Sequence, residues 1–278
     1  MELYLRPTTL AAALAARAER PCSVLAGGTD HFPLRATQPR SETVLDIGAI
    51  ASLRGIERRA EGWWIPALAT WSDVIAAPLP AAFDGLKHAA RQVGGRQIQN
   101  AGTLVGNLCH ASPAADGIPC LLALNACVVL ESLRGARVVT VADFVTGPRS
   151  TLLRQDELAT GLLVPDAGGV GRFEKLGARA YLVISVVMVA AWARLERGVI
   201  VEARVAVGAC GPRAVLLAEL AASLAGQRPA DAAISAAALA GLSPIDDIRA
   251  PAAYRHRAAL ELVRRAVAGL GDARAQAA

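Results

Sequence analysis

The sequence predicts an α+β protein built from two domains, each containing both strands and helices. Its 278 residues exceed the usual domain size of about 100 to 150 residues. Hydrophobic residues make up 54% of the chain and charged residues 19%, which is typical of a compact fold. The segment DAGGVG at residues 166–171 has no hydrophobic periodicity, so we place a linker there, between domains at residues 1–165 and 172–278.

The first domain opens with the pattern of a small β-α-β-β unit, in a part that spans about residues 1–55. Thr8 and Thr9 suit a helix N-cap, and Leu10 and Leu14 lie one helical turn apart. The run CSVL has the composition of a strand and leads into the turn AGGTD. The expected elements are strands at residues 3–5, 22–25 and 44–47 and a helix at residues 7–19.

The larger part of this domain, about residues 56–165, contains one long irregular stretch. Before it, a strand-like WWIPAL precedes a helix for which Thr70 or Ser72 is the expected cap. Residues 94–119 show no periodicity, and a loop of this length inside a compact domain is usually functional. The other expected elements are helices at residues 79–93 and 121–126 and a hairpin that pairs residues 127–131 with 136–141 across SLRG.

The second domain is expected to combine an antiparallel sheet with helices. A strand-like RFEKLGAR precedes an apolar segment that ends at Leu195, a turn at Gly198 and the alternating strand VEARVAVGA. The apolar run of residues 181–193 is shorter than the roughly 20 residues that cross a bilayer, so we expect it in the core. The expected helices are residues 216–225, 230–242 and 252–270.

Composition argues against several classes of protein. The net charge is +5, but the arginines are dispersed and form no basic cluster for nucleic acid. The opening MELYLRP has no signal-peptide pattern, and the five cysteines form no C-x-x-C pair, so we expect reduced thiols and a cytoplasmic protein. Because the four histidines are scattered, we expect no metal bound by this chain alone.

The turn AGGTD at residues 26–30 is the first candidate site. Paired glycines remove two Cβ atoms, permit positive φ, and let consecutive N–H groups point to one side, where they can bind an anion. Thr29 adds a hydroxyl and Asp30 adds an acceptor. The alternative is a tight turn with no ligand.

The second candidate site is TLVGNLCHASPAAD at residues 103–116. Gly106 permits close backbone approach, Asn107 can donate and accept, and Ser112 precedes a proline that fixes an extended turn. Asp116 suits sugar hydroxyls because a phosphate would repel it. A plain loop remains the alternative, and the chain has no G-x-G-x-x-G, Walker or G-x-S-x-G motif.

The two turns together resemble the FAD-binding medium subunit of molybdenum hydroxylases, the flavoprotein family of xanthine dehydrogenase and carbon monoxide dehydrogenase. That family has A-G-G-T-D followed by T-[LI]-G-G-N-x-x-x-x-S-P-x-x-D. Further similar blocks, in chain order, are LYLRPTTLAAALA, GGRQIQNAGTLVGN, FVTGPRSTLLRQDELATGLLVP, FEKLGARAYLVISVV and DDIRAPAAYRHRAALELVRRA. The resemblance therefore covers nearly the whole chain.

The resemblance implies a two-part FAD-binding domain of the vanillyl-alcohol-oxidase or PCMH type and a carbon monoxide dehydrogenase flavoprotein-like C-terminal domain. Lys175 matches a lysine that reaches the cofactor, although a solvated strand lysine is the alternative. Val105 departs from the family by replacing a glycine of its G-G-N, and Gln99 stands where arginine is common. If that position needs positive φ, Val105 is strained. The implied FAD-binding residues are Leu25, Ala26, Gly27, Gly28, Thr29, Asp30, Ile98, Thr103, Leu104, Gly106, Asn107, Ser112, Asp116 and Lys175.

The function implied by the resemblance is electron transfer within a molybdopterin-dependent hydroxylase or dehydrogenase. FAD on this chain then takes electrons from a small [2Fe-2S] subunit and passes them to NAD, a quinone or another acceptor. A large subunit with the molybdopterin cofactor oxidises the substrate, and this chain supplies no catalytic residue. An independent FAD-dependent oxidase or reductase and a nucleotide-binding structural module are the alternatives.

Overall fold

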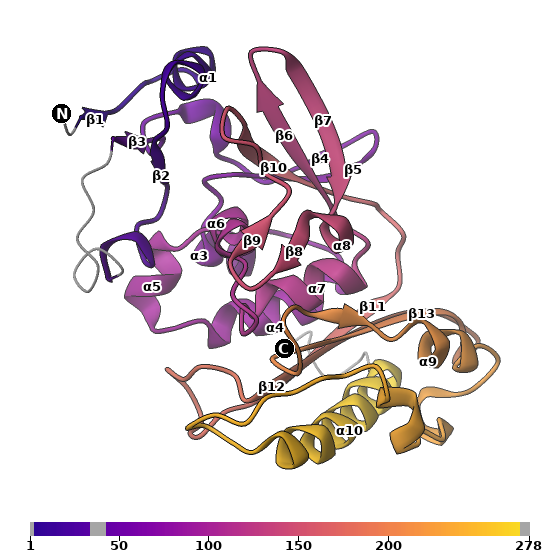
Figure 1. The fold of residues 1–278 in the computed structure, drawn as a ribbon. Helices are drawn as coiled ribbons and strands as arrows, with labels where there is room; N and C mark the ends of the chain where they lie inside the picture. Colours follow the sequence, from indigo (N-terminus) through magenta and orange to yellow (C-terminus); the bar gives the residue numbers. More distant parts are fainter. Residues whose placement is uncertain (1–2, 34–42, 273–278) are drawn as a thin grey trace.

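The structure is a computed structural model that describes residues 3–33 and 43–272 (Figure 1). A small sheet and a five-stranded sheet form the N-terminal half, and a four-stranded sheet with one long helix forms the C-terminal half. The predicted α+β class is confirmed. Within the described part of the chain, no helix is long and apolar enough to cross a membrane.

The small sheet at the N-terminus is parallel, with the strand order β1-β3-β2. Helix α1 follows the first strand, and its N-cap Thr9 accepts a hydrogen bond from the Ala12 N–H at 3.3 Å. The observed order of elements is the predicted β-α-β-β order. The bounds are β1 Tyr4–Leu5, α1 Leu10–Glu19, β2 Ser23–Leu25 and β3 Val44–Asp46.

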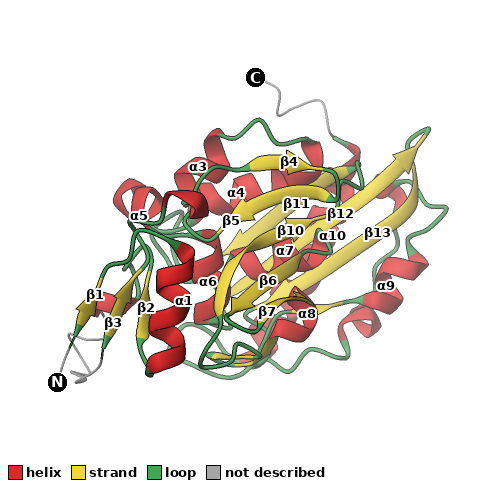
Figure 2. Cartoon of the chain, turned by 90° about the horizontal axis from the view of Figure 1, so that it is seen from above, coloured by secondary structure: helices red, strands yellow, loops and turns green. Residues whose placement is uncertain are grey.

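The second sheet is antiparallel, with the order β4-β5-β10-β6-β7 (Figure 2). The predicted hairpin is present as β6 and β7, and Gly135, the first residue of β7 after the turn, has a φ of +117°. The sequence analysis missed β10, the central strand, because Gly161 interrupts its apolar pattern. Glycine is needed there, since a Cβ would lie 2.4 Å from the Trp64 ring. The bounds are β4 Glu57–Arg59, β5 Gly62–Pro66, β6 Cys127–Ser132, β7 Gly135–Thr140 and β10 Leu158–Val164.

Short helices fill the stretch that we expected to be irregular. Residues 94–119 contain α5, α6 and the start of α7, so that expectation is wrong. Six- and seven-residue helices are too short to show a hydrophobic period. Thr70, one of the two predicted caps, starts α3 in a capping box with Asp73. The bounds are η1 Ala51–Leu53, α3 Trp71–Ala76, η2 Ala81–Phe83, α4 Asp84–Gln92, α5 Arg96–Ala101, α6 Leu104–His110, α7 Gly117–Ala123, α8 Val141–Phe144, β8 Val145–Gly147 and β9 Ser150–Thr151.

The C-terminal sheet is antiparallel, and both of its faces are buried. On β12, Val187, Val189 and Ala191 belong to the core shared with α10. The alternate residues Met188 and Trp192 belong to the core shared with the N-terminal domain. The apolar run is therefore continuous because each face of the strand meets its own layer, as Figure 1 shows. The bounds are β11 Val170–Leu176, β12 Val187–Glu196, β13 Val199–Gly208 and β14 Val215–Leu216.

One predicted helix of the C-terminal domain is wrong. Residues 230–242 hold only two short 3₁₀ turns, separated by a segment with extended backbone at Ala232 and Ser235. The Ile234 carbonyl accepts hydrogen bonds from Arg264 Nε at 3.0 Å and Nη2 at 2.7 Å, so this tertiary contact replaces a helical one. The bounds are α9 Ala218–Ser223, η3 Pro229–Asp231, η4 Ala236–Leu239, α10 Ala252–Ala268 and η5 Gly269–Gly271.

The two domains meet where η2 and α4 lie on β11. Two glycines permit this contact: a Cβ on Gly171 would lie 2.3 Å from the Ala82 carbonyl oxygen. A Cβ on Gly85 would lie 2.8 Å from the Arg172 carbonyl oxygen. Elsewhere along the same junction, Arg204 stacks on Trp192 at 3.9 Å and donates to the Ala123 carbonyl at 2.8 Å. The junction is therefore a close backbone contact fixed by an arginine.

Candidate cofactor site

The first turn follows β2 directly. Leu25, the last residue of that strand, is paired in register with Asp46 of β3, and its carbonyl accepts from the Ile47 N–H at 3.0 Å. Gly28 has a φ of +72°, and a Cβ there would lie 2.7 Å from the Phe32 ring. The positive φ favours glycine at this position, whereas the exposed Phe32 ring could move aside. Thr29 and Asp30 continue the turn at the edge of the small sheet.

The second segment begins as the N-terminal turn of α6. Thr103 caps this helix, because its Oγ1 accepts from the Gly106 N–H at 3.0 Å. A Cβ on Gly106 would lie only 2.6 Å from the same oxygen, so glycine makes room for the cap. Val105 lies inside the helix, is 3% exposed and does not have positive φ. The expected strain at Val105 is therefore absent.

The two turns lie side by side, although they are far apart in the sequence. A Cβ on Gly27 would lie 2.0 Å from the Ala101 carbonyl oxygen, so the first turn rests directly on the backbone that precedes Thr103. A Cβ on Gly102 would lie 3.2 Å from Thr29 Oγ1. Farther along, His110 Nε2 is 3.9 Å from Asp30 Oδ1. The first turn and the backbone that leads into α6 thus meet between the two parts of the N-terminal domain.

Other predicted residues hold this arrangement. Asn107 Oδ1 accepts from the Gly117 N–H at 3.3 Å, and Ser112 Oγ accepts from the Ala114 N–H at 3.3 Å. The side chain of Leu104 is fully buried in the core. Ile98 on α5 is 38% exposed, and its carbonyl accepts from the Gly102 N–H at 2.7 Å. Gln99, on the same helix, donates to the Arg91 carbonyl at 3.0 Å and so ties α5 to α4.

Asp116 and Lys175 form a buried ion pair at the domain junction. Lys175 Nζ is 2.6 Å from Asp116 Oδ2, and only 5% of the lysine side chain is exposed. Ser185 Oγ donates to Asp116 Oδ1 at 2.5 Å. Burial raises the pKa of Asp116, while Lys175 and Ser185 act in the opposite direction. A solvated Lys175 is thus excluded, and a sugar hydroxyl would have to compete with both partners for the carboxylate.

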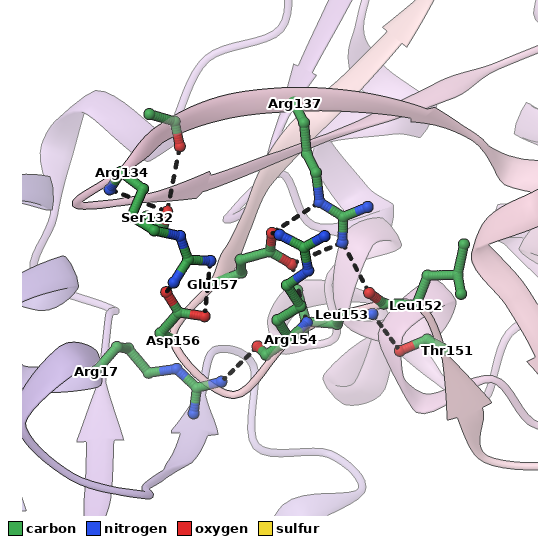
Figure 3. Close-up of polar contacts among 11 residues, drawn as sticks. Arg17, Ser132, Arg134, Arg137, Thr151, Leu152, Leu153, Arg154, Asp156 and Glu157 are labelled. Carbon is green, nitrogen blue, oxygen red and sulfur yellow. Dashed lines mark hydrogen bonds and ion pairs between the residues drawn. The ribbon is translucent and has the colours of Figure 1, made fainter.

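A second buried carboxylate, Glu157, lies in the loop before β10 (Figure 3). Arg137 binds it through Nε at 2.7 Å and Nη2 at 2.8 Å, and the Arg154 N–H donates to it at 2.9 Å. The hydrogen bonds from Arg137 are the main reason that the pKa of Glu157 is lowered, against the effect of burial. The same loop reaches the small sheet, because Arg17 donates to the carbonyls of Arg154 at 3.5 Å and Cys22 at 2.6 Å.

Two cavities lie away from these turns. One of about 340 Å³ lies between β13 and α9, and one of about 440 Å³ lies between the start of α1 and the five-stranded sheet. Neither is lined by a predicted site residue. The candidate site therefore rests on the geometry of the turns. Sequence reasoning also missed Ser185, although a lone serine in an apolar run is a signal for a buried polar contact.

Comparison with known proteins assigns both halves of the chain to described families. Residues 1–167 match the family described as the FAD binding domain in molybdopterin dehydrogenase, and residues 173–270 match the CO dehydrogenase flavoprotein C-terminal domain. The nicotinate dehydrogenase FAD-subunit of Eubacterium barkeri is 36% identical over 60% of this chain and 59% of its own length. A putative xanthine dehydrogenase FAD-binding subunit of Escherichia coli is 33% identical over 76% of this chain and 75% of its own length.

Solved structures show the same fold over nearly the whole chain. Carbon monoxide dehydrogenase from Hydrogenophaga pseudoflava gives a TM-score of 0.91 at 28% identity, and the match covers 98% of both chains. Quinoline 2-oxidoreductase from Pseudomonas putida 86 gives 0.88 at 25% identity, with coverage of 98% of this chain and 97% of the other. This chain therefore belongs to the family of FAD-binding subunits of the molybdenum hydroxylases and is an oxidoreductase subunit.

Proposed function

We propose that this chain carries electrons through FAD inside a multi-subunit molybdenum hydroxylase. In this proposal, a small subunit with [2Fe-2S] clusters reduces the flavin, and the flavin reduces an external acceptor such as NAD or a quinone. A large molybdopterin subunit oxidises the organic substrate. The names of the relatives support this division of labour, since the carbon monoxide dehydrogenase relative of Hydrogenophaga pseudoflava is a medium chain and the nicotinate dehydrogenase relative is an FAD-subunit.

The observation that carries the proposal is the contact between the two turns. Gly27 lies against the Ala101 carbonyl and Gly102 lies against Thr29, so the first turn lies beside the backbone that leads into the Thr103 cap of α6. Such a pair of backbone segments suits a long dinucleotide, which needs N–H groups and hydroxyls along its length. The residues proposed to hold FAD are those of the first turn together with Ile98, Thr103, Gly106, Asn107 and Ser112.

Lys175 and Asp116 are proposed to act at the flavin end of the cofactor. FAD supplies a ring that accepts and releases electrons, and the protein's part is to bind it, orient it and set its electrostatic surroundings. A buried lysine paired with a carboxylate provides a fixed dipole at the domain junction. The two domains thus both contribute to the cofactor's surroundings.

The site is tested by replacing two glycines, each of which has a positive φ, with valine. Gly28→Val should abolish FAD retention, because the side chain meets the Phe32 ring and φ is +72°. Gly55→Val is the control: its φ is +87°, but no atom lies within 4 Å of its Cβ. Absorbance at the flavin bands after gel filtration gives the occupancy. Stoichiometric FAD in folded Gly28→Val protein would falsify the site.

The role in electron transfer is tested by anaerobic mixing. In a complex reconstituted with the large and small subunits, an organic substrate should bleach the flavin. With this chain alone, purines, N-heterocycles, aldehydes and carbon monoxide should leave it oxidised. Bleaching of the isolated chain at the rate of the complex would instead establish an independent FAD-dependent oxidase or reductase.

A further inference from the structure

Behind the first turn, Asp46 holds three groups from the small sheet. Its Oδ2 accepts from the Tyr4 hydroxyl and lies 3.1 Å from Arg6 Nε, and its Oδ1 accepts from the Gly48 N–H at 2.8 Å. The Asp46 side chain is 11% exposed, whereas that of Arg6 is 60% exposed. Arg6 is therefore an exposed guanidinium fixed at one end by a buried carboxylate.

The topology places Arg6 on the same edge as the first turn. The strands of the small sheet are parallel, so their carboxyl ends share one edge, the edge at which α/β sheets commonly bind ligands. Arg6 follows β1, Asp46 ends β3 and Ala26 follows β2. Because β3 lies between the other two strands, Arg6 and Ala26 start roughly 10 Å apart. The contact with Asp46 draws the guanidinium toward the middle of this edge.

The charges of the candidate site call for a cation at this edge. The diphosphate of FAD is anionic, yet Lys175, the one lysine or arginine among the predicted site residues, is paired with Asp116 at the domain junction. Asp30 adds a further negative charge to the first turn itself. Without a further cation, only backbone N–H groups, which carry no net charge, would face the negative charge of the diphosphate. An arginine near the turn would supply the missing positive charge.

We infer that Arg6 binds the diphosphate of FAD. This inference rests on the proposed function and adds a residue that the sequence analysis did not include. Nε keeps its contact with Asp46, while none of the described residues accepts a hydrogen bond from the two terminal nitrogens. Those nitrogens form a planar fork that matches phosphate oxygens. Tyr4 and the Gly48 N–H position Arg6 indirectly, by fixing the Asp46 carboxylate.

Titration of the FAD-free full chain tests the inference. Arg6→Gln should raise the Kd for FAD about ten- to hundredfold, as expected for the loss of a charged hydrogen-bond pair. Its Kd for riboflavin, which lacks the diphosphate, should stay within about twofold. The Kd of the wild type should rise with salt more steeply than that of Arg6→Gln, because salt screens the lost attraction. Arg6→Lys should retain part of that salt dependence.

Two controls separate binding from folding. Tyr4→Phe loosens the Asp46 carboxylate but leaves the charge of Arg6 in place, so it should raise the Kd for FAD less than Arg6→Gln does and should keep most of the salt dependence. Arg58→Gln removes an exposed arginine that pairs with Asp166 at 2.6 Å, and it should leave the Kd for FAD unchanged. A wild-type Kd and salt dependence in Arg6→Gln overturn the inference, as does an equal loss of FAD and riboflavin. If the wild type takes up no FAD, the proposed function itself fails.

Discussion

Two buried carboxylates of this protein are each held by one cationic side chain, but their pKa values move in opposite directions. Asp116 is 7% exposed and Glu157 is 2% exposed, so both are covered, but Asp116 lies deep at the domain junction whereas Glu157 lies close to the protein surface. Burial dominates at Asp116 and raises its pKa, whereas the hydrogen bonds of Arg137 dominate at Glu157 and lower its pKa. The carboxylates therefore differ in depth as well as in their partners.

The partners differ in number and in contact with water. Glu157 accepts two hydrogen bonds from Arg137 and one from the backbone of Arg154, and the Arg137 side chain stays 30% exposed. Asp116 has one cation, Lys175, whose side chain is 5% exposed. Removing both members of a pair from water costs more than their attraction returns unless further hydrogen bonds are made. The pair of Asp116 and Lys175 therefore costs more free energy to remove from water than the pair of Glu157 and Arg137.

The largest effect is expected when the cation of the junction pair is removed. Lys175→Met leaves Asp116 buried without its cation and should lower the free energy of unfolding by about 3 to 5 kcal/mol. Urea denaturation measures this loss. The double variant Lys175→Met with Asp116→Asn removes both charges and should be more stable than the single variant. Equal stability of the two would show that the pair is not coupled.

Glu157→Gln should have a smaller effect, about 1.5 to 3 kcal/mol, because it weakens charged hydrogen bonds while Arg137 keeps access to water. Thermal or urea unfolding gives the value. Arg137→Leu serves as the partner variant, and the double variant should lose less than the sum of the two single losses. Additive losses would contradict the direct contact shown in Figure 3.

The pH dependence of stability should have opposite signs at the two sites. The folded-state pKa of Asp116 lies above its ordinary 3.8, so the folded protein binds that proton first. The wild type should therefore gain stability relative to Asp116→Asn as the pH falls through that range. The folded-state pKa of Glu157 lies below its ordinary 4.5, so the wild type should lose stability relative to Glu157→Gln as the pH falls below about 4.5. Urea unfolding of the three proteins from pH 7 to pH 3.5 measures both slopes, and slopes of one sign would refute the contrast.

Arg154→Ala should have the smallest effect, below about 0.5 kcal/mol. The Arg154 side chain is 60% exposed and lies 4.0 Å from Glu157, whereas its backbone N–H makes the hydrogen bond and survives the substitution. Differential scanning calorimetry of this variant beside Glu157→Gln gives the comparison. A loss as large as that of Glu157→Gln would mean that the exposed side chain contributes more than its geometry indicates.

Sequence reasoning succeeded where the signal is local. The hairpin at SLRG, the cap at Thr70 and the glycine requirement at Gly28 each follow from a few neighbouring residues, and the structure has all three. It failed at β10 and at residues 230–242, where a contact from elsewhere decides the conformation. In the first case the Trp64 ring requires glycine inside a strand, and in the second Arg264 binds the Ile234 carbonyl.

In the candidate site, too, local features could be predicted from the sequence, whereas contacts between distant segments could not. Both glycine turns are recognisable in the sequence, but the need for Gly27 becomes clear only when the Ala101 carbonyl is seen against it. The partner of Lys175 lies 59 residues earlier in the chain, and no local pattern links it to Asp116. The inferred contribution of Arg6 was not predictable, because Arg6 follows a two-residue strand and only the order of strands in the small sheet places it at the same edge as the first turn.

The glycine contacts of η2 and α4 with β11 determine how the whole chain unfolds on heating. With Gly171 against Ala82 and Gly85 against Arg172, the backbones leave no room for a side chain, so neither domain can tilt or slide without breaking the contact. The face of β12 that carries Met188 and Trp192 would then lose its cover. Unfolding of either domain thus exposes the core of the other to water. The chain should therefore unfold in one cooperative calorimetric transition.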